Sequence, residues 1–279
     1  MYILVSGERI LGSVVFKISV GFVTGALILL AVSLYLSNRF QEDHLRLAET
    51  GNLQGAMNRL EWAARLNPFS PEPQSSEAYL ELRQGRPEAA DSAFREAIRR
   101  DPYNYRNYEA LGNLQGQQLD DPEAAVKSYR EALSHNPHAA TVVSRLADAL
   151  VTTGDIEGAR TQYEWLHERG RIPLRDLYTL GKIQMRLGEP EEAIETLEEA
   201  RERADAELEA SDEQQETQRR AFLESLDLAV ADALVVQRSY DEARDYLAQS
   251  EAEQAPAILA LLDEDPEGYR RSVFDASIN

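Results

Sequence analysis

Residues 85–102 read GRPEAADSAFREAIRRDP, and this stretch decides the fold because its small and large residues recur at a fixed spacing. Its frame consists of a glycine, an alanine, a large residue, a second alanine and a proline, at Gly85, Ala90, Phe94, Ala97 and Pro102. The same frame stands 34 residues earlier, at Gly51, Ala56, Leu60, Ala63 and Pro68. Self-similarity at a period of about 20–50 residues is the sequence mark of a repeat protein.

Four further copies follow along the chain, so that the first alanine of the frame occurs at Ala56, Ala90, Ala125, Ala159, Ala193 and Ala243. The steps between these alanines are 34, 35, 34, 34 and 50 residues. Two departures stand out. One extra residue lies near Leu119–Asp121, and about 16 extra residues lie within 206–220 in the last step.

The frame has a physical reading as a pair of antiparallel helices. Small residues allow two helices to approach closely, and large residues three or four positions away fill the groove beside them. Glycine ends the first helix and proline follows the end of the second. The small–large–small pattern, the closing proline and the 34-residue step resemble the tetratricopeptide repeat (TPR) family over residues 41–256.

The resemblance implies an all-α, TPR-like α-solenoid of about six helix-turn-helix repeats. For the insert at about 206–220, which is polar and helix-prone, we expect either a lengthened first helix or a mobile segment. Terminal repeats of a stack need a polar outer face. In 257–279 we therefore expect a capping helix near Ala257–Leu262, followed by a loose tail.

A short flank, residues 1–17, precedes the apolar stretch Ile18–Leu36, ISVGFVTGALILLAVSLYL. Nineteen residues span roughly 28 Å as a helix, close to the hydrocarbon thickness of a bilayer. The stretch predicts one transmembrane helix. A cleaved signal peptide is the nearest alternative, but a cut after Ser37 would place Tyr35 where a small residue is required.

Gly21 and Gly25 form a G-x-x-x-G motif, through which two membrane helices could pack as a homodimer. Lysine and arginine are balanced on the two sides of the stretch, and the amino terminus favours an inside N-terminus. The repeat domain is then expected outside the cytoplasm, attached to the membrane by a single pass.

Composition narrows the function. The formal charge is −20 and the pI about 4.6, which argues against nucleic acid as a partner. There is no cysteine, and the four histidines match no metal-binding motif. The sequence carries no hydrolase, nucleotide-binding or dinucleotide-binding motif. We expect no catalytic activity, no metal and no cofactor.

The family resemblance implies a concave groove lined by the first helix of each repeat. The frame places eleven residues on this face: Tyr79, Arg83, Arg106, Asn113, Gln117, Ser144, Asp148, Arg175, Tyr178, Lys182 and Arg186. Five are basic and one is acidic, in an acidic protein. Such a face favours a protein partner with an acidic segment, or an acidic helix.

The sequence therefore predicts a membrane-anchored scaffold that recruits a protein partner through this groove, in the assembly or biogenesis of an envelope complex. Two alternatives remain. The chain could be a non-catalytic accessory subunit of a membrane enzyme complex, packed through its other surfaces. It could also be a glycan- or polymer-binding module in polysaccharide export, in which Tyr79 and Tyr178 would matter more than the arginines.

Overall fold

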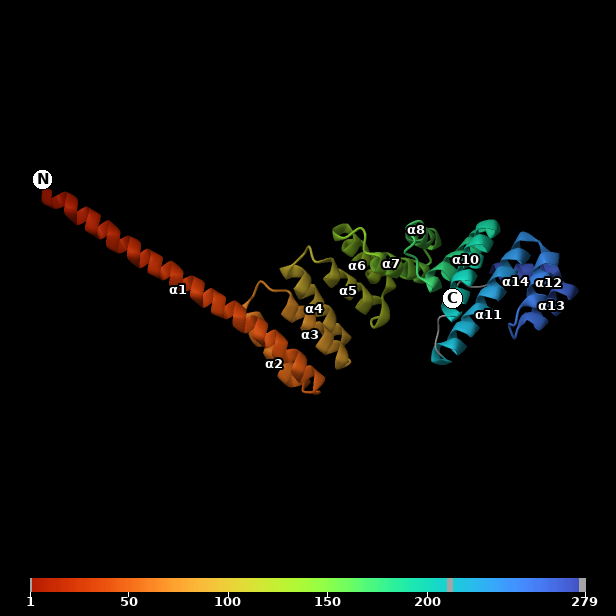
Figure 1. Ribbon diagram of the computed structural model, residues 1–279, viewed down its shortest axis with the longest axis horizontal. Helices are drawn as coiled ribbons and strands as arrows, with labels where there is room; N and C mark the ends of the chain where they lie inside the picture. Colours follow the sequence, from red (N-terminus) through yellow and green to blue (C-terminus); the bar gives the residue numbers. More distant parts are fainter. Residues whose placement is uncertain (1, 210–212, 276–279) are drawn as a thin grey trace. The chain divides into compact units, whose positions relative to one another are not determined.

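The computed structural model describes residues 2–209 and 213–275, which form fourteen α-helices and no strand. The helices belong to two compact units, Met1–Asp121 (unit 1) and Pro122–Asn279 (unit 2). Unit 1 contains α1 (Tyr2–Glu49), α2 (Leu53–Leu66), α3 (Glu72–Arg83), α4 (Pro87–Arg100) and α5 (Tyr105–Gln117). Unit 2 contains α6 (Pro122–His135), α7 (Ala140–Thr153), α8 (Ile156–His167), α9 (Leu174–Leu187), α10 (Pro190–Glu209), α11 (Glu213–Gln237), α12 (Tyr240–Gln249), α13 (Ala255–Glu264) and α14 (Pro266–Asp275). The all-α class is confirmed (Figure 1).

Helix α1 is one continuous helix of 48 residues that contains the whole apolar stretch. Its N-terminal part stands apart from the other helices of unit 1 (Figure 1), and its large apolar side chains from Val20 to Leu36 are mostly exposed. Within the described residues, the segment Ser19–Glu49 is the one helix long and apolar enough to cross a membrane, with a mean hydropathy of 2.1 in its most apolar window. Its length and composition make this segment a candidate membrane span. A signal sequence near the N-terminus has the same length and composition.

The last turns of α1 serve as the first helix of the first repeat. Helix α2 packs against them, and Ala48 of α1 shares a buried cluster with Ala56, Leu60 and Leu80. The contact extends back to Ser37, which is buried and whose hydroxyl donates to the Ala63 carbonyl at 2.9 Å. The repeat stack is thus joined to the apolar stretch by unbroken helix.

The six frame alanines explain why the helices pack in pairs. Each of them is 0% exposed: Ala56, Ala90, Ala125, Ala159, Ala193 and Ala243. The large residue four positions later is also buried in every copy, with Phe94 and Tyr163 among the largest fully buried side chains. A close helix contact at the alanine and a filled groove beside it are the packing that the frame predicts.

The glycines of the frame end first helices in the left-handed conformation. Gly51, Gly85, Gly154 and Gly188 have φ between +70° and +82°. The two copies that lack the glycine keep the geometry with other residues, Asp120 at φ +51° and Arg238 at φ +71°. Left-handed backbone costs a non-glycine residue about 1–2 kcal/mol, less for Asp, whose short side chain bonds locally.

Arg238→Gly is therefore expected to raise the free energy of unfolding by about 0.5–1 kcal/mol, since it removes this conformational cost. The Arg238 side chain contributes one exposed ion pair with Glu267 at 3.6 Å, which is worth little. Chemical denaturation of the two proteins measures the difference. Asp120→Gly is the matched control, with a smaller expected gain, and a loss of stability in Arg238→Gly would contradict this account.

At Gly181, helices α9 and α10 pack closely against each other. A Cβ built at this position would lie 2.5 Å from Cγ of Leu197, which is fully buried. Alanine is favoured over glycine in a helix by about 1 kcal/mol, but overpacking a core costs about 1–3 kcal/mol. We expect Gly181→Ala to lower the free energy of unfolding by about 1 kcal/mol.

The sign should reverse in a Leu197→Ala background, where the space has been opened and only the helix preference remains. A double-mutant cycle by urea denaturation measures both effects. Equal losses in the two backgrounds would mean that α9 and α10 do not meet at this glycine.

The C-terminal part of unit 2 departs from the regular repeat. Helices α10 and α11 are long, at 20 and 25 residues, and residues 210–212 of the expected insert lie outside the described residues. Helix α13 covers the expected capping segment. The following residues, for which the sequence suggests a loose tail, instead form α14, which packs against α11 and α13. Tyr269 explains this packing, because its hydroxyl donates to Asp232 of α11 at 2.8 Å.

Candidate functional site

Unit 2 has a pocket of about 240 Å³ bordered by α9, α11 and α14. Its walls are formed by Tyr178, Lys182, Met185, Arg186, Ser225, Leu228, Ala229, Asp232, Val236, Val273 and Phe274. Three of the groove residues expected from the sequence, Tyr178, Lys182 and Arg186, come together here on consecutive turns of α9. The spacing of four residues places them on one helix face.

The polar groups of this pocket come from opposite walls. On α9, the Lys182 ammonium lies 5.5 Å from the centre of the Tyr178 ring. On α11, Asp232 accepts the Tyr269 hydroxyl of α14. Burial raises the pKa of Asp232 to about 6, although the Tyr269 hydrogen bond and the Lys182 charge both favour the ionised carboxylate. Near neutral pH the pocket holds two cations and one anion, in a chain of charge −20.

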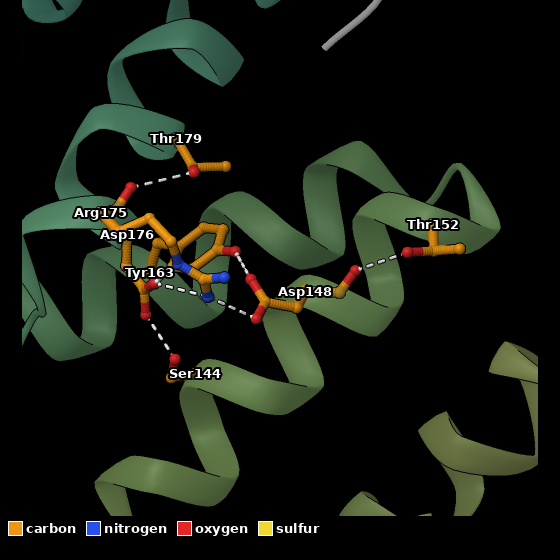
Figure 2. A network of polar contacts seen from close by, with 7 residues as sticks. All are labelled: Ser144, Asp148, Thr152, Tyr163, Arg175, Asp176 and Thr179. Carbon is orange, nitrogen blue, oxygen red and sulfur yellow. Dashed lines mark hydrogen bonds and ion pairs between the residues drawn. The ribbon is translucent and has the colours of Figure 1, made fainter. Parts of the chain in front are cut away.

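Three other expected groove residues of unit 2 form a closed polar network instead (Figure 2). Arg175 donates to Asp148 at 2.6 Å and to Asp176 at 3.1 Å. Asp176, which is 1% exposed, also accepts the Ser144 hydroxyl. These contacts join α7 to α9, so the charge of Arg175 is already matched by two carboxylates within the fold.

Tyr163 of α8 completes this network. Its ring is fully buried, and its hydroxyl donates to the second oxygen of Asp148 at 2.6 Å (Figure 2). Burial and the neighbouring Asp148 carboxylate raise the pKa of this phenol, which keeps it protonated as a donor. The arrangement stabilises the packing of α7, α8 and α9, and it offers fewer contacts to a ligand than its composition suggests.

Unit 1 has a separate pocket of about 260 Å³, lined by Tyr79, Leu82, Phe94, Ala110, Asn113, Leu114, Gln117 and Gln118. Tyr79, Asn113 and Gln117 are groove residues expected from the sequence. Tyr79 packs edge-on against Phe94, with ring centres 5.2 Å apart, and remains 56% exposed. Amide side chains beside an exposed ring can bond the backbone of an extended peptide.

The remaining two groove residues lie outside that pocket. Arg83 donates to the Ala48 carbonyl at 3.1 Å and so closes the carboxyl end of α1. Arg106 is fully exposed, and a hydrogen bond with Tyr105 raises its pKa. Within unit 2, Lys182 and Arg186 are the expected basic residues that line a common pocket.

The repeat spacing could have predicted which residues of α11 form the opposite wall of the unit 2 pocket. Counting 50 residues on from Gly181 of α9 gives the fully buried Ala231 of α11. The same count takes Tyr178 to Leu228, Lys182 to Asp232 and Arg186 to Val236, all three of which line the pocket. The irregular last step hid this correspondence.

A third recess of about 400 Å³ lies between α10, α11 and α12 around Asp227. Asp227 accepts hydrogen bonds from Arg201 at 2.6 Å and Ser250 at 2.9 Å, which ties these helices together. Metal ligation has no candidate among the described residues, where no group of three His, Asp or Glu side chains could hold an ion.

Comparisons with known proteins agree with this architecture. Family models described as tetratricopeptide repeat match residues 45–105, 75–114, 117–164 and 177–206. No curated protein matches the chain significantly. Among solved structures, a tetratricopeptide repeat protein from Parabacteroides merdae ATCC 43184 has a TM-score of 0.56 at 15% identity, over 86% of this chain and 90% of that one.

The MamA protein gives a TM-score of 0.54 at 18% identity, over 61% of this chain and 92% of its own. A MamA fragment from Desulfovibrio magneticus RS-1 gives 0.52 at 16% identity, over 60% and 94%. At these identities the likeness concerns the fold alone.

Proposed function

Because the chain belongs to the tetratricopeptide repeat family, we propose that it is a membrane-anchored scaffold that holds a protein partner on the concave side of its repeats. The observation that carries this proposal is the pocket of unit 2, where Tyr178, Lys182 and Arg186 of α9 face Asp232 of α11. A basic pocket in a strongly acidic chain selects for a ligand of opposite charge.

The anchor in this proposal is the apolar helix Ile18–Leu36. Cleavage after Ser37 would remove the hydroxyls of Ser33 and Ser37, which bond the carboxyl half of α2 at 2.7 and 2.9 Å. Retention of the helix preserves this packing, which favours an anchor over a signal peptide. Gly21 and Gly25 both face open space, so two such helices could approach closely in the bilayer.

The ligand that fits the unit 2 pocket is a peptide with a carboxylate next to an apolar or aromatic side chain. The carboxylate meets Lys182 and Arg186, and the apolar side chain packs among Tyr178, Val236 and Phe274. Arginine can bind a carboxylate with two parallel hydrogen bonds. The neutral pocket of unit 1, with Asn113 and Gln117, suits a stretch of peptide backbone.

The experiment that tests the proposal compares two charge reversals of equal size in the full-length chain. Lys182→Glu with Arg186→Glu is expected to weaken capture of the partner from solubilised membranes by at least about tenfold, because the ligand's carboxylate would face two like charges. Lys127→Glu with Arg130→Glu is the matched control, since both residues are exposed on α6. Unchanged capture in the first variant would overturn the proposal.

Retention on a glycan matrix tests the polymer-binding alternative, which Tyr79 and Tyr178 favour by their position in the two pockets. In that case Tyr79→Ala with Tyr178→Ala abolishes retention on a glycan matrix, and the charge reversals do not.

Protease treatment of cells with a permeabilised outer layer tests on which side of the membrane the repeats lie. Digestion of residues 41–279 places the repeats outside the cytoplasm, as proposed.

A further inference from the structure

The carboxyl end of α2 lies beside the last turn of the apolar stretch. Helix α2 follows α1 and packs along it in the opposite direction. The Ser37 hydroxyl bonds the Ala63 carbonyl at 2.9 Å, and one turn closer to the N-terminus the Ser33 hydroxyl bonds the Leu66 carbonyl at 2.7 Å. These two bonds fix how far α2 extends along α1.

The position of α2 along α1 determines how deep the end of α2 lies relative to the bilayer. Ser33 lies three residues before Leu36, the end of the apolar stretch, or about 4.5 Å along the helix axis. If Ile18–Leu36 spans the membrane, Leu66 lies level with Ser33, in the last turn of the apolar stretch. The end of α2 and the connection to α3 at 67–71 then come to lie at the inner edge of the headgroup layer, where it meets the hydrocarbon core.

The side chains at this edge suit that layer. Phe69, in the connection itself, is 87% exposed. Trp62, in the last turns of α2, is 51% exposed. The Arg65 guanidinium lies 5.2 Å from the centre of its ring and pairs with Glu61 of the same helix at 2.5 Å. Aromatic rings of this kind gather at membrane–water interfaces, and arginine reaches lipid phosphates there.

The next connection of unit 1 lies at the same edge. The Arg100 guanidinium, at the end of α4, donates to the Ser70 carbonyl at 3.2 Å, which joins the end of α4 to the connection that carries Phe69. Three residues further on, Tyr103 is 78% exposed. Phe69 and Tyr103 follow the prolines Pro68 and Pro102, so they are equivalent positions of two successive repeats.

We propose that this interfacial edge, formed by Trp62, Arg65, Phe69 and Tyr103, docks on the lipid surface next to the membrane helix. The proposal rests on the membrane anchor of the proposed function. A lipid surface is the occupant because the edge continues the apolar stretch at a depth that hydrogen bonds set. The consequence is that α2, α3 and α4 are held against the membrane at a fixed angle, rather than moving freely on a tether.

The two tryptophans of the chain allow a direct test, because Trp62 lies at the edge and Trp165 lies in α8 of unit 2. Full-length Trp165→Phe protein is reconstituted into phosphatidylcholine–phosphatidylglycerol vesicles, with lipids brominated near the top of the acyl chains. We expect the emission of Trp62 to shift to the blue and to fall by roughly half, as for a ring at the interface. The matched variant Trp62→Phe, which reports on Trp165, should keep its emission.

Phe69→Asp with Tyr103→Asp, added to Trp165→Phe, is expected to abolish most of this quenching while the protein still floats with the vesicles. Circular dichroism checks that this variant is folded. Flotation with no quenching of Trp62 in the parent would overturn the docked edge and leave the anchor intact. Failure of the parent to float would overturn the anchor, and the docked edge with it.

Discussion

Tyr163→Ala is expected to lower the free energy of unfolding by about 3–5 kcal/mol, the largest effect of any substitution considered, as for other buried aromatic residues cut back to alanine. The Tyr163 side chain is fully buried in α8, at the position of the frame that fills the groove beside a frame alanine. Its removal leaves a cavity and also takes a donor from Asp148, which keeps its ion pair with the exposed Arg175.

Tyr163→Phe separates the two contributions, because it keeps the ring and removes the hydroxyl. We expect it to cost about 1 kcal/mol, the usual net value of one hydrogen bond. Urea denaturation of both variants gives the comparison. If phenylalanine and alanine lowered stability equally, the hydrogen bond to Asp148 would matter more than the packing, and the frame would be wrong at this position.

Asp232→Asn is expected to remove a pH dependence from the stability of unit 2. The pKa of Asp232 is about 6 in the folded chain, against 3.8 for an unperturbed aspartate. The folded state therefore retains a proton that the unfolded state loses between these values. The contribution of Asp232 to stability is complete below pH 3.8 and is lost as the pH rises through 6.

A difference of about two pKa units corresponds to about 2–3 kcal/mol. Relative to the wild type, Asp232→Asn should therefore gain this amount as the pH is raised from about 4 to about 7. Denaturation midpoints across this range measure it. Tyr269→Phe is the control, because loss of the hydrogen bond from Tyr269 should move the transition to higher pH. Parallel pH profiles for wild type and Asp232→Asn would contradict this assignment.

The helical repeat could be predicted from the sequence because its determinants are local. A small residue at Ala159 and a large one at Tyr163 specify the packing of one helix pair, and the pattern repeats often enough to be recognised. The left-handed position could be located even without glycine, since Arg238 stands where the frame requires it. What escaped prediction depends on contacts between residues far apart in the chain.

The expected groove residues show most clearly that contacts between distant residues escape prediction from the sequence. Arg175 looks available in the sequence, but Asp148 of α7 approaches it across 27 residues and, with the adjacent Asp176, matches its charge. Helix α14 was expected as a tail because its sequence is polar, and the Tyr269–Asp232 bond that holds it spans 37 residues. Charge counted along one helix cannot include the acids that another helix brings.

The most direct test of the scaffold model is photo-crosslinking in intact cells, from a p-benzoylphenylalanine placed at Tyr178 or, as a control, at Lys127. We expect a partner protein to be crosslinked from position 178 in the membrane fraction, and we expect Lys182→Glu with Arg186→Glu to abolish the product. Crosslinking from position 127 with none from 178 would contradict the account, because the partner would then be bound outside the pocket of α9, α11 and α14.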